Sequence, residues 1–283
     1  MTNSIGGLQI RTTKNVITPD TKICMLLYAP NKFGKTTMMA SLDTMLQKFF
    51  GTRLLDIACE PGEGGGTMSI QEMDVPFVVP QNLNDIEKII AELGTSTQFG
   101  GVAMDSSSEM VKRFLLPYAL KFPSRERTPT RDAGVPERSD YQTMGEKARE
   151  IFNKLINLTC HPDPKLRKHL LVTACEKEKT DDRGNVLQIQ PDLPGAMAGA
   201  ATAMFQTVAG IAIRTSVENN PSNPTQKIRV SRRVLLTHAD GVRIVGDRTK
   251  VFPAEGPLDF VELWEKHWLP RIADIQAKAK GGD

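Results

Sequence analysis

The sequence has little net charge, few cysteines and no long apolar run, and these features limit the partners, the cross-links and the location that we expect. A formal charge of +3 over 283 residues does not by itself indicate a nucleic-acid partner, so such a partner must be argued from where the basic residues lie. No apolar run approaches the roughly 20 residues that span a bilayer, and the first residues carry no basic segment followed by an apolar one. We therefore expect a cytoplasmic protein with no membrane partner.

Cysteine is scarce, and its placement argues against a disulfide framework or a metal site. Three of the cysteines lie in apolar runs, where a thiol behaves as a small hydrophobic group. The cysteines are Cys24, Cys59, Cys160 and Cys175. We expect them to be reduced and buried.

Short β-branched or apolar runs alternate with longer segments whose apolar residues recur at three- and four-residue spacing. The short runs predict strands at 23–28, 53–58, 76–79, 101–105, 169–175 and 207–214. The longer segments predict helices at 35–49, 82–93, 107–120 and 141–159. This alternation is typical of an α/β fold with a mostly parallel sheet flanked by helices.

Past residue 205 the sequence becomes rich in strand-forming residues. IRVSRRVLLT and VRIVGD flank Asp240-Gly241, a dipeptide that favours the tight turn of an antiparallel hairpin. Three segments, 122–140, 176–204 and 218–226, read as irregular. The first two are longer than ordinary connections, and long loops in a compact domain are often functional.

The strongest chemical signal is an apolar strand that runs into Gly34-Lys35-Thr36-Thr37 and then into a helix. In this order the loop turns backbone N–H groups towards phosphates, Lys35 reaches the outer phosphates and Thr36 holds magnesium. The alternative is a chance FGKTT at a strand–helix junction. The predicted ATP and Mg²⁺ site consists of Ala29, Pro30, Asn31, Lys32, Phe33, Gly34, Lys35, Thr36 and Thr37.

Two acids follow predicted strands and complete the candidate site. Asp105 ends the run 101–105, where it could hold magnesium-bound water, although an acid there is also a common helix cap. Glu60 follows the run 53–58 and could polarise the water that attacks the γ-phosphate. Its rivals are Asp56 and Glu63, and the simpler alternative is a solvated loop acid.

In their order along the chain, these motifs resemble the RecA-like P-loop ATPases of bacteriophages, including Sak-type recombinases and single-strand annealing proteins. The resemblance covers roughly residues 20–255 and also involves HLLVTACEKEK, QPDLPG and GDRTK. It implies a RecA-like core at 21–255, between an N-terminal extension at 1–20 and a C-terminal helix and tail at 256–283. It also implies that Glu60 is the catalytic carboxylate and that Asp105 belongs to the magnesium site.

The resemblance further implies that the two long segments face single-stranded DNA at the centre of a homo-oligomer. Both carry basic residues, although solvated charged loops are common. The candidate DNA-binding residues are Arg125, Arg127, Arg131, Lys177 and Lys179. Further on, Arg248 and Lys250 resemble a pair that acts on the ATP of a neighbouring subunit, in a basic ribbon that would also suit nucleic acid or a solvated hairpin face.

The chain departs from the family pattern at two places. Ala29 stands where the motif has its first glycine, so the loop must enter with ordinary dihedrals or lose affinity, because alanine tolerates positive φ poorly. Cys175 and Glu176 stand where relatives often have a polar sensor of the γ-phosphate. Thr173 and Gln188 are the remaining candidates for that role, unless coupling between ATP and DNA is weak.

The sequence therefore predicts a DNA-dependent ATPase of phage recombination, located in the host cytoplasm. We expect a ring or filament on single-stranded DNA that promotes annealing or strand exchange, with a single-strand-binding protein as a further partner. One alternative is a hexameric helicase-like DNA motor on the same core. A second, from another class, is a nucleotide-dependent binding or assembly protein that does not hydrolyse ATP.

Overall fold

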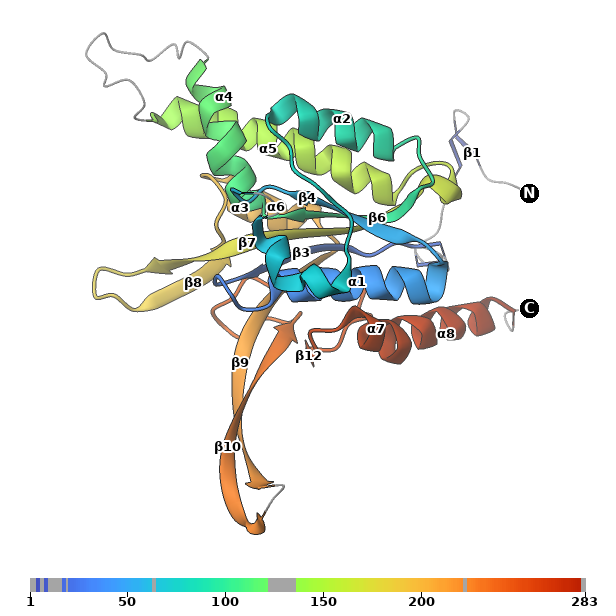
Figure 1. Cartoon of the computed structure of the whole chain (residues 1–283), viewed down its shortest axis with the longest axis vertical. Helices are drawn as coiled ribbons and strands as arrows, with labels where there is room; N and C mark the ends of the chain where they lie inside the picture. The colour runs from blue at the N-terminus through green and yellow to red at the C-terminus, as the bar shows by residue number, and fades with distance from the viewer. Residues whose placement is uncertain are drawn as a thin grey trace.

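A ten-stranded mixed sheet with helices on both faces forms the body of the protein (Figure 1). The computed structural model describes residues 4–5, 8–9, 17–18, 20–62, 65–121, 136–220 and 223–280. The strand order is β12-β10-β9-β3-β7-β6-β4-β5, with β11 added beside β9 and β8 beside β7. A separate two-stranded sheet pairs β1 (Ser4–Ile5) with β2 (Leu8–Gln9).

Six strands form the parallel part of the sheet, and they are the six that the sequence predicts. They are β3 (Cys24–Ala29), β4 (Arg53–Ala58), β5 (Phe77–Val78), β6 (Phe99–Asp105), β7 (His169–Thr180) and the first residues of β9 (Thr207–Asn220). Parallel strands buried on both faces read as continuous apolar runs, which is why composition alone located them. The α/β class predicted for a RecA-like P-loop core is confirmed.

Helices cover the two faces of the sheet and create two apolar cores. One core lies under α2 (Leu83–Leu93), α4 (Leu116–Lys121) and α5 (Arg138–Thr159), and the other under α1 (Lys35–Phe50) and the C-terminal helices (Figure 1). The remaining helical segments are η2 (Gly65–Met73), α3 (Ser107–Met110), η3 (Val111–Leu115), η4 (Pro164–Leu166), α6 (Met197–Met204), α7 (Phe260–Leu263), η5 (Trp264–Trp268) and α8 (Leu269–Lys280).

The C-terminal aromatic stripe packs in the core on the α1 side. Phe260, Leu263, Trp264 and Trp268 are all buried, and the two tryptophan rings stack with centroids 5.4 Å apart. Apolar residues at helical spacing usually pack against a domain core, and this stripe does so.

The strand-rich end contains an antiparallel hairpin, but its turn is not at Asp240-Gly241. β9 pairs along its length with β10 (Asn223–Leu236), whereas Asp240-Gly241 lies in the irregular connection to β11 (Gly246–Asp247). The segment 218–226, predicted to be irregular, instead belongs largely to these two strands. The last strand, β12 (Glu255–Gly256), pairs with β10.

The segment 176–204 is also more regular than predicted. β7 continues to Thr180 and pairs antiparallel with β8 (Val186–Pro191), and α6 follows. The other predicted loop, 122–140, lies outside the described residues except for its end, where α5 begins.

All cysteines are free, but only Cys24 and Cys59 are buried. Cys160 is exposed where α5 ends, and Cys175 is half-buried near the point where β7 leaves the core, so the prediction of burial is wrong for these two. Within the described residues, no helix has the length and apolar character needed to cross a membrane.

Candidate nucleotide-binding site

The loop between β3 and α1 has the form expected of a phosphate-binding loop. Gly34 caps α1 in the left-handed conformation with φ 100°, which costs glycine little, and Lys35 and Thr36 form the first helical turn. The Lys35 ammonium donates to the carbonyl oxygens of Ala29 (3.0 Å) and Pro30 (2.9 Å). Lys35 thus spans the loop from its entrance to its exit.

Ala29 is accommodated without strain at the position of the missing glycine. It is the last, fully buried residue of β3 and pairs with Cys175 of β7 in extended conformation. The positive φ values of the loop fall at Lys32 (64°) and Gly34 (100°). Of the two outcomes open from the sequence, entry with ordinary dihedrals is the one observed.

Asp105 meets the P-loop at the carboxyl edge of the sheet. Its Oδ2 accepts a hydrogen bond from Thr36 Oγ1 at 2.8 Å, and its Oδ1 accepts one from Thr173 of β7. The helix cap that competed for this role is supplied instead by Ser106, whose side chain accepts from the backbone of Glu109. The carboxylate is therefore joined to Thr36 rather than used to start the following helix.

Glu60 lies beside Thr36 because two neighbouring groups hold it there. Arg113 donates to the carbonyl oxygens of Cys59 (2.7 Å) and Glu60 (2.9 Å), which fixes the turn after β4. At Gly66 an added Cβ would lie 2.9 Å from Glu60 Oε2 and 3.4 Å from Thr36 Oγ1. Gly66 thus brings η2 close to both side chains, and a larger residue there would displace the Glu60 carboxylate.

The three acids considered from the sequence occupy different environments. Glu60 is half-buried and lines the cavity, and burial together with the negative charge of Asp105 raises its pKa, against the opposing charge of Lys35. Asp56 is fully buried, and neither carboxyl oxygen has a hydrogen-bond partner in the described structure. Desolvation, then Asp105, raises the pKa of Asp56 well above its usual range, which favours the neutral acid. Glu63 lies outside the described residues.

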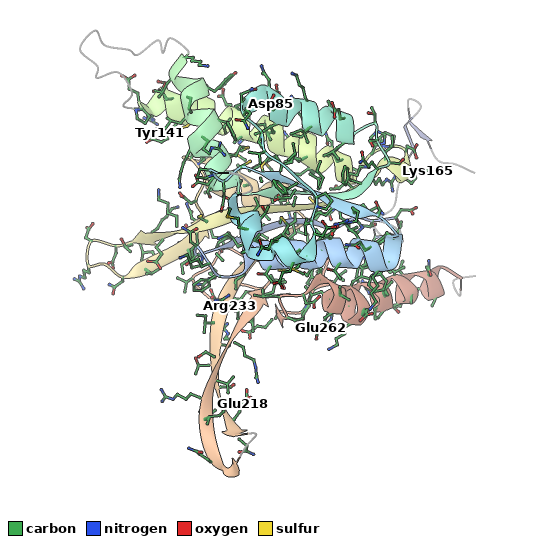
Figure 2. All side chains as sticks on the ribbon, viewed as in Figure 1. Asp85, Tyr141, Lys165, Glu218, Arg233 and Glu262 are labelled. Atoms are coloured by element: carbon green, nitrogen blue, oxygen red, sulfur yellow. The ribbon has the colours of Figure 1, made fainter. Side chains whose placement is uncertain are left out.

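Lys35, Thr36 and Glu60 line a cavity of about 670 Å³, a size suited to a nucleotide-sized ligand. One lining residue that sequence reasoning did not assign to the site is Arg233 of β10. Its guanidinium lies 5.7 Å from the centroid of the Phe33 ring and approaches Gly34. Figure 2 labels Arg233 where the β9–β10 hairpin joins the body of the protein. No local sequence pattern could predict this contact, because Arg233 lies nearly 200 residues after the P-loop along the chain.

Neither Thr173 nor Gln188, the candidates for a γ-phosphate sensor, lines the cavity. Cys175 lines the cavity, and its thiol contacts Asn31 Oδ1 at 3.1 Å. Thr173 is fully buried and donates to Asp105. Gln188 accepts from Lys179 at 3.1 Å on the β7–β8 hairpin and is not among the residues that line this cavity.

The donor set fits Mg²⁺ only if the nucleotide supplies further ligands. Thr36 and Asp105 present oxygen atoms, the ligand type that Mg²⁺ prefers. The described residues contain no group of three or more His, Cys, Asp or Glu that could hold a metal by themselves. Magnesium sites of this kind take one or two protein oxygens, with phosphate and water for the rest.

Arg248 and Lys250 lie at the opposite edge of the sheet from the P-loop. Thr207 pairs with Met25 of β3 and with Asp247 of β11, so the turn after Asp247 is at the amino edge. Asp247 fixes this turn by accepting from Thr207 (2.9 Å), Val251 (2.9 Å) and Phe252 (2.9 Å). Both basic side chains are exposed, away from the chain's own cavity.

The predicted DNA-binding residues are only partly within the described structure. Arg125, Arg127 and Arg131 fall outside it. Lys177 and Lys179 are exposed on one face of the β7–β8 hairpin, opposite Gln190 and Gln188.

No family model and no curated protein matches the chain. Solved structures do match it, among them the flagellar accessory protein FlaH from Methanocaldococcus jannaschii. The identity is 8%, the match covers 79% of this chain and 88% of that one, and the TM-score is 0.36. That score is too low to inform on function. The strand order and the loop geometry describe a nucleotide-binding fold of the P-loop ATPase type.

Proposed function

We propose that this protein binds ATP with Mg²⁺ and hydrolyses it, as a RecA-like ATPase that acts on single-stranded DNA. One observation carries the nucleotide part of this proposal: Thr36, which lines the same cavity as Lys35 and Glu60, is hydrogen-bonded to the buried Asp105 of β6. A loop that binds phosphate, an oxygen pair for magnesium and an acid for water are the three parts that phosphoryl transfer needs.

Each of these residues has a distinct role in the proposed reaction. Lys35 neutralises the outer phosphates, Thr36 and Asp105 would hold magnesium, and Asp105 orients Thr36 by accepting its hydroxyl hydrogen bond. Magnesium, when bound, offsets charge on the β- and γ-phosphates. Glu60 orients the water whose attack on the γ-phosphorus breaks the bond to the β-phosphate oxygen of ADP.

We further propose a homo-oligomer, ring or filament, that assembles on single-stranded DNA and promotes annealing or strand exchange in phage recombination. Support comes from the family-like order of the motifs and from the position of Arg248 and Lys250. Because these two residues lie away from their own cavity, any nucleotide that they contact belongs to a neighbouring subunit. We expect a single-strand-binding protein as a further partner.

The test measures ATP turnover with and without single strands, together with annealing of complementary oligonucleotides. We expect turnover that single strands stimulate, and faster annealing with ATP present. Unwinding of a forked duplex without annealing would instead indicate a helicase-like motor. Tight ATP binding with negligible turnover would indicate a nucleotide-dependent binding or assembly protein.

A further inference from the structure

The β9–β10 hairpin extends beyond the layer of α1 and α7 as a two-stranded arm (Figure 1). We define the arm as residues 213–219 of β9 and 227–233 of β10, which begin where the buried part of each strand ends. Cross-strand partners in an antiparallel pair share one face, and successive residues alternate between faces. The register therefore assigns every arm residue to one of two faces.

On the first face, both arginines are engaged in ion pairs, and we call it the paired face. Arg214 lies opposite Arg232 on this face. Arg214 Nε is 2.8 Å from Glu255 Oε1, and Arg232 Nη2 is 2.7 Å from Glu218 Oε2. The positive charge of this face is thus neutralised within the protein.

The opposite face, which we call the unpaired face, has cations but no acid. Its members are Ile213, Thr215, Val217 and Asn219 of β9, with Lys227, Arg229, Ser231 and Arg233 of β10. No ion pair to Lys227, Arg229 or Arg233 occurs within the described residues. From Arg233 to Lys227 the row extends about 20 Å at ~3.3 Å per residue.

The charge of this arm contrasts with that of the β7–β8 hairpin. Residues 207–236 carry five basic residues and one acid, whereas 169–191 carry three basic residues and four acids. A net positive ribbon whose single acid, Glu218, lies on one face presents its excess charge on the other. The unpaired face is therefore a surface complementary to a polyanion.

We propose that the unpaired face of the arm binds the phosphate backbone of a single-stranded nucleic acid. This rests on the proposed function, for which it names a binding surface that the family resemblance does not. Arg, Lys, Ser, Thr and Asn are the side chains that contact phosphates in such complexes, and all five occur on this face. Protein interfaces are instead depleted in Lys and enriched in aromatics, which this face lacks.

The experiment compares two double variants that remove the same charge from opposite faces of the arm. Lys227→Gln/Arg229→Gln changes the unpaired face, and Arg214→Gln/Arg232→Gln is its control on the paired face. Arg233 is left intact because it lines the nucleotide cavity. Binding of an oligo-dT strand is measured across a salt series, with ATP binding and the sedimentation coefficient recorded for each variant.

We expect only the unpaired-face variant to bind single strands more weakly, with its log–log salt slope reduced by about 0.7 for each phosphate that it no longer neutralises. ATP binding should remain unchanged in both variants. Equal weakening in the two variants would overturn the proposal, because it would show a response to net charge alone. A smaller sedimentation coefficient for the unpaired-face variant without DNA would also overturn it, in favour of an interface between copies of the chain.

Two further outcomes separate this proposal from the proposed function. If wild-type protein binds ATP but no single strand, the DNA part of the proposed function fails. If wild type and the unpaired-face variant bind the strand equally, only the assignment to the arm fails. A larger effect of the variant on a duplex of the same length than on oligo-dT would overturn the single-strand specificity.

Discussion

The nucleotide cavity and the β9–β10 arm both present charged groups, but they organise them in opposite ways. In the cavity, Lys35 is bonded to loop carbonyls, Thr36 to Asp105, and Arg113 to the backbone that carries Glu60. On the unpaired face of the arm, the cations have no acid to fix them. The cavity is preorganised for one ligand geometry, whereas the arm offers charge to a flexible partner.

This difference predicts how each region responds to substitution. Removing one group from a preorganised site leaves its partners and the ligand without their bonds, so single changes have large effects. Removing one cation from a distributed surface weakens only one of several phosphate interactions. The predictions below run from the largest expected effect to the smallest.

Lys35→Ala should lower ATP affinity by roughly 10²–10⁴-fold, because it removes charge-assisted bonds to the β- and γ-phosphates that are each worth about 1.5–3 kcal/mol. The loop also loses its internal clamp. Thr36→Ala should remove the magnesium dependence of binding. Nucleotide titration by fluorescence measures both, and circular dichroism checks folding. Lys48→Ala, near the end of the same helix and exposed, is the control. Wild-type affinity in Lys35→Ala would contradict the assignment of the P-loop.

Glu60→Gln should bind ATP normally and lower kcat by roughly 10²–10⁴-fold, because an amide orients water less well than a carboxylate and does not polarise it as strongly. Asp56→Asn is the matched comparison, since Asp56 is buried and does not line the cavity. Single-turnover hydrolysis measures the effect. If Asp56→Asn is the slow variant, the base has been placed on the wrong acid.

Arg248→Ala/Lys250→Ala should lower ATPase activity by about 30-fold, corresponding to about 2 kcal/mol for an unpaired charge at an interface, while the isolated subunit still binds ATP. The diagnostic measurement mixes these subunits with Lys35→Ala subunits, which keep the basic pair. Partial recovery of activity in the mixture would place the pair across an interface. A fully active DNA-bound monomer would remove the basis for an oligomer.

The site could be predicted from sequence where its residues form a local pattern. Gly34, Lys35 and Thr36 follow a buried strand after the short loop 30–33, and Asp105 ends another strand, so the parallel sheet brings them to one edge. Asn82 and Gly94 likewise define the ends of α2, since Asn82 forms a capping box and Gly94 ends the helix.

Other features of the site and the fold could not be predicted from the sequence. They depend on contacts between segments that are far apart along the chain, or on local signals that favour a different structure. Arg113 and Arg233 reach the site from elements whose own sequences contain no nucleotide motif. Asp240-Gly241 is a strong turn signal but does not join the hairpin strands, because β10 pairs with β9 instead. In 176–180, charge suggested a loop, although Lys177 and Lys179 alternate with acids at the spacing of a strand.

Burial of Asp56 in β4 should make stability depend on pH. Its folded-state pKa is raised by burial, so the folded chain keeps a proton that the unfolded chain releases. The contribution is complete below the unfolded pKa and is lost as pH rises towards the folded pKa, by up to about 1.4 kcal/mol per pH unit. Thermal unfolding of the ligand-free protein from pH 5 to 9 should therefore show a smaller decline in Asp56→Asn than in wild type. Parallel curves would mean that Asp56 is ionised in the folded chain.

Arg233 is where the two regions meet, because it belongs to the unpaired face and also lines the nucleotide cavity. Its guanidinium is exposed to solvent, so a phosphate interaction there should contribute no more than about 1 kcal/mol, or roughly fivefold in ATP affinity. Arg229→Ala, four residues along the same strand and face, removes the same charge beyond the cavity. We expect Arg233→Ala to weaken ATP more than AMP, since AMP lacks the outer phosphates, while Arg229→Ala leaves both affinities unchanged. Equal nucleotide affinities in the two variants would show that Arg233 does not contribute to nucleotide binding. Arg233 would then act only as a member of the unpaired face.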